Sequence, residues 1–218
     1  MTATNYTYNY DPIGNRTNSV SNGVGTTYAR NSLNQYTNIT GAGARVMKYD
    51  LDGNLTNSGV FAYTWDAENR LVSVSSNGTV LASYKYDYMS RRYQKAAGTT
   101  TNTFLYDGWN VISEVSRQSS VVSTNAYTWG MDLSGSLQGA GGIGGLLAAR
   151  ISGTNVLYCY DANGNVTDLV GTNRAVLATY KYDPYGNLIS KSGEMADANR
   201  FRFSTKYTDN ETGLLYYG

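Results

Sequence analysis

The sequence has no histidine, one cysteine and two prolines among its 218 residues. Without histidine, the commonest general base and the commonest metal ligand of proteins are both missing. The single cysteine, Cys159, excludes an intrachain disulfide, and its place between Tyr158 and Tyr160 predicts a small apolar strand residue rather than a nucleophile. These absences disfavour most enzyme classes, and we expect no catalytic residues, no metal and no cofactor.

Charge and long apolar runs are also scarce. Charged residues make up 15% of the chain, and 17 Lys and Arg nearly cancel 16 Asp and Glu. Because the charges are scattered singly, the sequence offers no basic patch to nucleic acid or to an anionic membrane. No apolar run approaches the roughly 20 residues that span a bilayer, and residues 1–5 lack the pattern of a signal peptide. We expect no nucleic-acid partner, no membrane span, and any export signal outside this sequence.

Glycine (24) and tyrosine (21) are in excess, and they recur in a repeated unit. The unit reads aromatic-x-aromatic-Asp, two further residues, then Gly-Asn or a similar pair. Clear copies contain Tyr8, Tyr10, Asp11 and Gly14; Tyr158, Tyr160, Asp161 and Gly164; and Tyr180, Tyr182, Asp183 and Gly186. Partial copies contain Tyr49, Asp50 and Gly53; Trp65 and Asp66; Tyr86 and Asp87; and Tyr106 and Asp107, and decayed copies lie at 28–34 and 127–130. Most neighbouring copies are about 16 to 22 residues apart, the length of two strands and two turns.

Each unit predicts a strand followed by a hairpin turn. Aromatic residues two positions apart lie on one face of a strand, so Tyr180 and Tyr182 should stand side by side. In the Asp-Pro-x-Gly form, the Asp carboxylate accepts backbone N–H groups, Pro sets φ, and Gly takes positive φ. Asn22-Gly23 and Asn77-Gly78 predict tight two-residue turns. The predicted fold class is all-β, a continuous antiparallel ribbon of hairpins, with no internal domain boundary and helix below about 10%.

Two stretches depart from this pattern. Residues 135–145 are rich in glycine and predict a tightly packed or bulged pair of strands. Their Gly139-x-Gly141-x-x-Gly144 spacing matches the dinucleotide fingerprint in letters, but repeats flank it where a strand and a helix are required. Residues 192–199 are the only place where the sequence predicts a short helical turn.

Other chemical signals have simpler explanations. The loops at Asp50 and Asp161 resemble calcium loops only in part, since neither has Gly at the sixth position and Glu at the twelfth. Four glutamates outside the repeat aspartates are too few for a paired-carboxylate site. An Asn- and Thr-rich repeat produces Asn-x-Thr sequons by chance. Rows of exposed tyrosines could stack on sugar rings, which leaves carbohydrate binding as an alternative.

The repeated units resemble the YD repeats of Rhs proteins, of the C components of insecticidal toxin complexes and of teneurins. The passage from Trp129 to Gly135 also resembles a recurrent Rhs sequence. The last residues, with Glu211, Thr212 and Gly213, resemble the opening of the Rhs repeat-associated core domain. The resemblance therefore divides the chain into YD repeats over 1–199 and the start of a core domain over 200–218.

This resemblance implies a ribbon curved as part of a hollow β-shell around a toxic polypeptide, in a secreted or cell-surface protein. In such proteins the self-cleavage segment follows the position of Gly218, so no catalytic residue is assigned here. We expect a structural, non-enzymatic segment of a larger protein, whose partners are a cargo polypeptide or other parts of the parent. The alternatives are a carbohydrate-binding module and a self-assembling module that associates head to tail through strand-like ends at 5–8 and 214–217.

Overall fold

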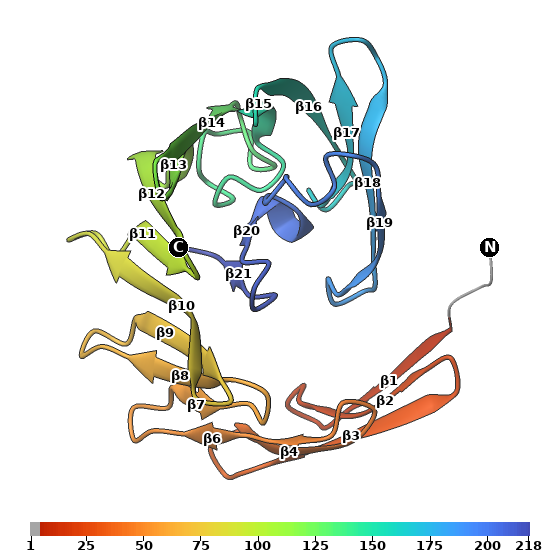
Figure 1. The fold of residues 1–218 in the computed structure, drawn as a ribbon. Helices are drawn as coiled ribbons and strands as arrows, with labels where there is room; N and C mark the ends of the chain where they lie inside the picture. The colour runs from red at the N-terminus through yellow and green to blue at the C-terminus, as the bar shows by residue number, and fades with distance from the viewer. Residues whose placement is uncertain (1–4) are drawn as a thin grey trace. The chain divides into compact units, whose positions relative to one another are not determined.

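The computed structural model describes residues 5–218, and nearly all of its regular structure is β-strand (Figure 1). The chain divides into two compact units, Met1–Leu81 and Ala82–Gly218. The sequence did not predict this division, because it falls inside strand β10 (Thr79–Tyr86), where the repeat pattern continues without a change in composition. No helix in the described part of the chain is long and apolar enough to cross a bilayer.

The first unit consists of antiparallel hairpins between neighbours in sequence. One sheet has the order β1 (Tyr6–Tyr10), β2 (Arg16–Ser21), β3 (Val24–Arg30), β4 (Tyr36–Gly41) and β5 (Arg45–Val46). A second series pairs β6 (Lys48–Tyr49), β7 (Leu55–Asn57), β8 (Ala62–Trp65) and β9 (Leu71–Ser76).

The second unit continues the same up-and-down order. It contains the larger part of β10, followed by β11 (Arg92–Ala97), β12 (Thr100–Asp107), β13 (Asn110–Gln118), β14 (Val121–Trp129), β15 (Leu146–Ile151), β16 (Thr154–Tyr160), β17 (Val166–Gly171), β18 (Val176–Tyr182) and β19 (Leu188–Ser192). The predicted ribbon of antiparallel hairpins is therefore confirmed.

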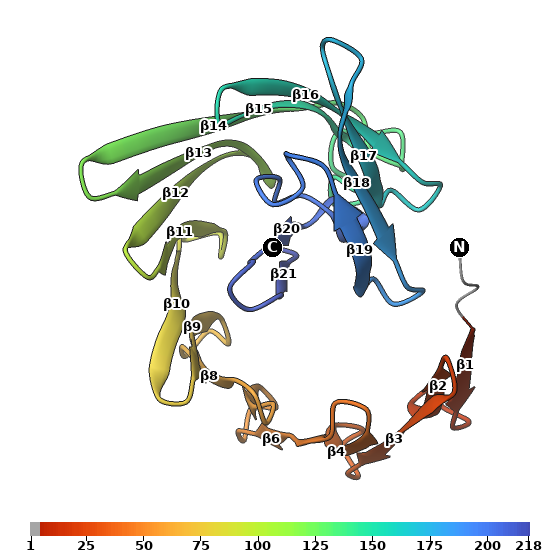
Figure 2. The same cartoon turned by 45° about the vertical axis from the view of Figure 1, so that its right-hand side comes forward.

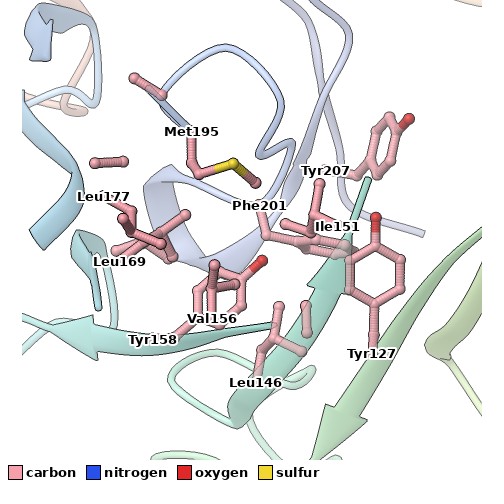
Figure 3. Packing of buried hydrophobic residues seen from close by; sticks show 14 of the residues in the cluster. Tyr127, Leu146, Ile151, Val156, Tyr158, Leu169, Leu177, Met195, Phe201 and Tyr207 are labelled. Carbon is pink, nitrogen blue, oxygen red and sulfur yellow. The ribbon is translucent and has the colours of Figure 1, made fainter. Parts of the chain in front are cut away.

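The strands of the second unit curve around the end of the chain. In both views β20 (Tyr207–Thr208) and β21 (Leu215–Tyr216) lie inside the arc of β11 to β19 (Figures 1 and 2). The main hydrophobic core fills the space between them. Inward residues such as Leu146, Ile151 and Leu169 pack there with Phe201 and Tyr207 of the final segment (Figure 3). We call residues 193–217 the inner segment.

Within residues 5–218, helical structure is confined to the inner segment. Residues 194–198 form turns, and the N–H of Asn199 donates to the carbonyl of Met195 at 3.0 Å, which is one helical turn in the predicted place. A 3-10 helix, η1 (Phe203–Thr205), was not predicted. Its Ser204 and Thr205 have φ of 51° and 52°, a backbone that ordinary residue types rarely favour, so their propensities gave no sign of it.

The prediction of a strand pair over 135–145 is wrong. These residues form a loop of turns, and the carboxylate of Asp132 organises it by accepting the N–H groups of Ser134, Ala140 and Gly142 at 2.7–3.0 Å. Four of its glycines, Gly135, Gly141, Gly142 and Gly144, have positive φ, which regular extended strands do not have. The loop is tightly packed, as expected, but through carboxylate hydrogen bonds rather than a sheet ladder.

The repeat turns share one geometry, headed by an aspartate. One carboxylate oxygen accepts the backbone N–H groups two and four residues later at 2.8–3.1 Å. The other oxygen accepts a side-chain N–H of the fifth residue at 2.7–3.1 Å. The aspartates and their fifth-position partners are Asp11 with Asn15, Asp50 with Asn54, Asp66 with Arg70, Asp87 with Arg91, Asp161 with Asn165, and Asp183 with Asn187.

The fourth residue of each turn has a left-handed backbone, as predicted. Gly14, Gly53, Gly164 and Gly186 have φ of 89°, 89°, 74° and 83°. Asn69 and Ser90 take the same place in the copies without glycine, with φ of 59° and 62°. The two-residue turns at Asn22-Gly23 and Asn77-Gly78 also have positive φ at both positions, as a type I′ turn requires.

Replacing a turn glycine by alanine should destabilise the protein through backbone strain. At Gly14 an added Cβ would meet no atom within 4 Å, so Gly14→Ala should lower the free energy of unfolding by about 1 kcal/mol from φ alone. Gly164→Ala should lower it further, because its Cβ would lie 2.5 Å from Ile143 and 3.0 Å from the Gly144 nitrogen. Denaturant unfolding measures both.

The matched control is Gly25→Ala in β3. Gly25 lacks a positive φ, and an added Cβ there also meets nothing within 4 Å. It should leave stability unchanged or raise it slightly, because alanine restricts the unfolded chain. Equal effects of Gly14→Ala and Gly25→Ala would contradict the turn interpretation.

Candidate functional site

In six copies of the repeat, the second aromatic residue braces the preceding hairpin with a side-chain hydrogen bond. Trp65 donates to the carbonyl of Leu55 at 2.8 Å, and Tyr182 donates to that of Val166 at 2.9 Å. The same contact is made by Tyr49 to Tyr36, Tyr106 to Arg92, Trp129 to Val111 and Tyr160 to Leu146. Each acceptor is the residue paired with the second position of the preceding unit, next to a bulge, such as Val166 opposite Tyr160. The brace therefore satisfies a carbonyl at an irregular point of the ladder.

The aromatic pairs stack along the strands, as predicted. The rings of Tyr158 and Tyr160 lie 6.4 Å apart, and those of Tyr180 and Tyr182 lie 6.5 Å apart, both pairs at 18°. Tyr158 is 8% exposed and Tyr180 is 2% exposed. In these copies the rows face the core, so they present no open stacking surface to a sugar.

Side chains also join consecutive turns along the edge of the ribbon. Asn15 donates to the amide oxygen of Asn34 at 3.3 Å, and Asn54 donates to that of Asn69 at 2.8 Å. Further along, a guanidinium nitrogen of Arg91 donates to the carbonyl of Gly108 at 2.6 Å. The donors occupy the fifth position of the turn, whose role the sequence interpretation missed.

Two aspartates differ from the sequence prediction: Asp107 does not head a five-residue turn, and Asp132 does. Asp107 was grouped with the turn aspartates, but it ends β12 and pairs with Asn110, leaving a loop of only Gly108 and Trp109. That loop is too short for the five-residue turn. Asp132 was not singled out, yet its N–H donates to the carbonyl of Ser136 and it heads the same kind of turn two residues late. The insertion after Trp129 hid this copy.

The inner segment is fixed to β11 by a buried group of charges. Asp209, which is 1% exposed, accepts from the guanidinium of Arg92 at 2.7 and 3.2 Å and from Lys95 at 3.0 Å. Lys95 also lies 2.9 Å from Glu211. Removing one partner of a buried ion pair leaves an uncompensated charge, which typically costs several kcal/mol. Asp209 is therefore the principal anchor of the inner segment. The sequence does not indicate this role, because the partners Arg92 and Lys95 lie 117 and 114 positions away.

The residues of the predicted core motif form a turn after this anchor. The N–H groups of Thr212 and Gly213 donate to the carbonyl of Asp209 at 3.2 and 2.7 Å. Gly213 has φ of 74°, and the N–H of Leu214 donates to the hydroxyl of Thr212 at 3.2 Å. The turn directs Glu211 to Lys95 and leads the chain into β21, which pairs with β20.

A second buried carboxylate holds the middle of the inner segment. Glu114 of β13 is 2% exposed and accepts from the hydroxyls of Tyr207 at 2.6 Å and Tyr127 at 2.9 Å. The side-chain amides of Asn102 and Asn125 donate to the same carboxylate at 2.6 and 3.1 Å. Burial, followed by the nearby Glu114 charge, raises the pKa values of Tyr127 and Tyr207 well above their usual range. Both tyrosines therefore remain neutral hydrogen-bond donors.

The turn carboxylates are held in their charged form by hydrogen bonds. The Asn15 amide makes the largest contribution to lowering the pKa of Asp11, and the Arg70 N–H does so for Asp66. At Asp50, Asp87 and Asp132, burial would raise the pKa, but several donors outweigh it, and the pKa of Asp132 falls to about 2. These oxygens are occupied by N–H groups, which supports a turn rather than a calcium loop at Asp50.

Removing a brace hydroxyl should destabilise the second unit. Tyr182→Phe leaves the carbonyl of the fully buried Val166 without its donor, so the free energy of unfolding should fall by about 1–2 kcal/mol. Tyr88→Phe is the control, because Tyr88 is 92% exposed. Denaturant unfolding of both variants measures the difference, and equal stability would argue against the brace.

Stability should fall in acid below about pH 4. The folded pKa values of Asp11, Asp50, Asp66, Asp87 and Asp132 lie below the usual 3.8, so the unfolded chain binds protons first. Their contribution is complete above the unfolded pKa and is lost as pH falls through the folded values, last for Asp132 near pH 2. Unfolding measured from pH 5 to pH 2 tests this. Asp132→Asn should flatten the lowest part of the profile, and a pH-independent free energy would contradict the assignment.

Comparisons with known proteins agree with this geometry. The family model Teneurin YD-shell matches residues 1–218. The chain is 34% identical over 216 residues to the tRNA3(Ser)-specific nuclease WapA of Bacillus spizizenii and 33% identical to the tRNA nuclease WapA of Bacillus subtilis strain 168. In both cases 96% of this chain aligns with 9% of the relative, so the chain spans a small part of their length.

Solved structures show the same fold. The crystal structure of TcdB2-TccC3 superposes with a TM-score of 0.54 at 16% identity, over 99% of this chain and 15% of that one. The Tc holotoxin pore of Photorhabdus luminescens, with the TccC3 D651A mutation, gives 0.54 over 98% of this chain and 15% of that one. At this identity the likeness concerns the fold alone. The full-length family match and the WapA relatives show that the chain belongs to the Teneurin YD-shell family.

Proposed function

We propose that this chain is a wall segment of a shell that encloses another polypeptide within a larger secreted or cell-surface protein of the toxin type. The observation that supports it best is the inner face of the second unit. That face buries a polypeptide segment with little regular structure, through aromatic packing around Phe201 and the Asp209 and Glu114 contacts. A surface of this kind suits the enclosure of peptide chain.

The proposed role is structural and non-catalytic. The WapA relatives are named as tRNA nucleases, but this chain aligns with only 9% of their length, so that name describes the whole relatives. The turn aspartates and the two buried carboxylates are engaged in hydrogen bonds that hold the fold, which leaves them no role as acid or base. We further propose that 1–199 are YD repeats and that 200–218 begin the core domain, which supplies most of the inner segment.

The other two candidate functions have less support. A carbohydrate-binding module needs exposed aromatic rows, whereas the Tyr158 and Tyr180 rows face the core. Head-to-tail association was expected from strand-like ends, but β21 pairs with β20, and the hydroxyl of Tyr216 accepts from the N–H of Arg92 at 2.7 Å. The end of the described chain therefore packs into its own unit.

Limited proteolysis of a full-length parent protein tests enclosure. The enclosed polypeptide should be cleaved more slowly in the intact protein than when it is expressed alone. Asp209→Asn should make it more accessible, because the variant weakens the anchor of the inner segment against Arg92 and Lys95.

The control is Glu68→Gln, which removes an exposed ion pair with Arg70 in the first unit. Exposed pairs contribute about 0–1 kcal/mol, so this variant should protect the polypeptide as well as the wild type. Equal cleavage of the polypeptide inside the intact protein and alone would overturn the proposed function.

A further inference from the structure

Arg202 is a buried cation without a carboxylate partner. It is 6% exposed, and within residues 5–218 it takes part in no ion pair. The comparably buried Arg92, 3% exposed, has Asp209 at 2.7 Å. Most buried charges in proteins are paired, because the interior does not replace the water that they lose.

The contacts of Arg202 offset only part of this loss. One terminal guanidinium nitrogen donates to the carbonyl of Ala196 at 3.1 Å, and the guanidinium carbon lies 5.7 Å from the centre of the Tyr180 ring. Its Nε is buried and has no hydrogen-bond partner. A carbonyl and a ring neutralise no charge, so the guanidinium retains the capacity for an anion.

A second unsatisfied group lies in the same place. The Oγ1 of Thr208 is buried and lacks a hydrogen-bond partner, and Thr208 is 8% exposed. Arg202 and Thr208 both line a pocket of about 600 Å³ between β19 and the inner segment. Buried polar groups are nearly always satisfied in native proteins, so two unsatisfied donors in residues that line the same pocket indicate a missing partner.

The other charges on the pocket do not supply that partner. Asp197 lines it, and the Lys191 hydrogen bond, with a smaller contribution from the Arg202 charge, lowers the pKa of Asp197. Its side chain is nevertheless 76% exposed and engaged with Lys191, and it forms no ion pair with Arg202 in the described residues. This pair cancels, which leaves Arg202 as the net positive charge of the lining. One planar guanidinium with one hydroxyl matches a carboxylate, which accepts two parallel N–H bonds and carries a single charge. A phosphate would bring a second charge with no second free cation to meet it.

We propose that this pocket binds a carboxylate, supplied by an aspartate or glutamate side chain of a polypeptide segment outside residues 5–218. The carboxylate chemistry follows from Arg202 and Thr208 alone, and its source in a polypeptide rests on the proposed function. Tyr182 and Phe203, which also line the pocket, would contact the apolar part of such a side chain.

The probe is N-acetylglutamate N-methylamide, with the uncharged glutamine analogue as its control. Titration into the chain should shift the Arg202 side-chain Nε–H resonance saturably, and the glutamine analogue should not. Arg202→Lys should weaken binding about tenfold or more, because lysine cannot form the bidentate pair. Arg150→Lys, on an exposed strand position, should bind as the wild type does. No saturable shift, or an equal response to both probes, would overturn the proposal.

Unfolding measurements provide a second readout. In the isolated chain Arg202→Met should not lower stability, since it removes a buried charge without a counter-ion. Arg92→Met should lower it, because Asp209 loses its guanidinium partner and keeps only Lys95. A loss for Arg202→Met as large as that for Arg92→Met would also overturn the proposal.

Hydrogen exchange of residues 196–210 in a full-length parent protein then identifies the source. If the probe no longer changes exchange there, the pocket holds a carboxylate of the parent's own chain. If the probe still slows exchange, the carboxylate comes from a separate polypeptide. Because probe binding to the isolated chain does not depend on enclosure, failure of this proposal and failure of the proposed function remain distinguishable.

Discussion

In each repeat hairpin the returning strand has one extra residue next to the turn, and the rest of the structure depends on how the ladder accommodates it. Opposite the second aromatic of a unit, the returning strand skips a residue, as between Tyr160 and Val166, so the ladder is interrupted once per copy. The interruption leaves a carbonyl to satisfy, and the next unit satisfies it, as Tyr182 does for Val166. The aromatic of one copy thus completes the hydrogen bonding of the previous one, which explains why the unit places its aromatics directly before the turn. Bulges of this kind also increase the bend of a sheet, so one device serves both the pairing and the curvature of the ribbon.

The inner segment is held in place by different interactions from those that hold the strands together. Its apolar contacts, such as Phe201 in the core, are joined by buried polar ones in which Asp209 meets Arg92 and Lys95. Hydrophobic packing alone would tolerate small shifts of the segment along the sheet. A buried carboxylate, in contrast, has one arrangement that leaves no charge unpaired. The charges therefore act mainly to fix the position of the segment on the sheet, and the aromatic packing supplies most of the favourable free energy.

Local features were predictable from the sequence, and distant pairings were not. The turn at Asp11 and the positive φ of Gly14 follow from residues within five positions of each other, and so do the Asn-Gly turns. The anchor of Asp209 joins residues 117 positions apart, and no local preference reports such a contact. The loop after Asp132 was misread because a glycine-rich stretch is compatible with both bulged strands and carboxylate-centred turns, and only the hydrogen bonds of Asp132 decide between them.

Which polar side chains have hydrogen-bond partners within the fold bears directly on the proposed enclosure of a polypeptide. Aspartates that could act as ligands or bases in another protein are occupied here by the N–H groups of their own turns, and Glu114 is occupied by tyrosine hydroxyls and amides. A repeat built this way presents little free chemistry on its inner side and can enclose a chain without reacting with it. The Nε of Arg202 and the Oγ1 of Thr208 are among the few buried side-chain atoms without a hydrogen-bond partner in the described residues, and of these few only Arg202 and Thr208 line the pocket beside β19. Most carboxylates of the repeats are occupied by their own turns, so a polypeptide enclosed by the shell would find few specific contacts there, whereas a carboxylate placed at the pocket would be held by Arg202 and Thr208.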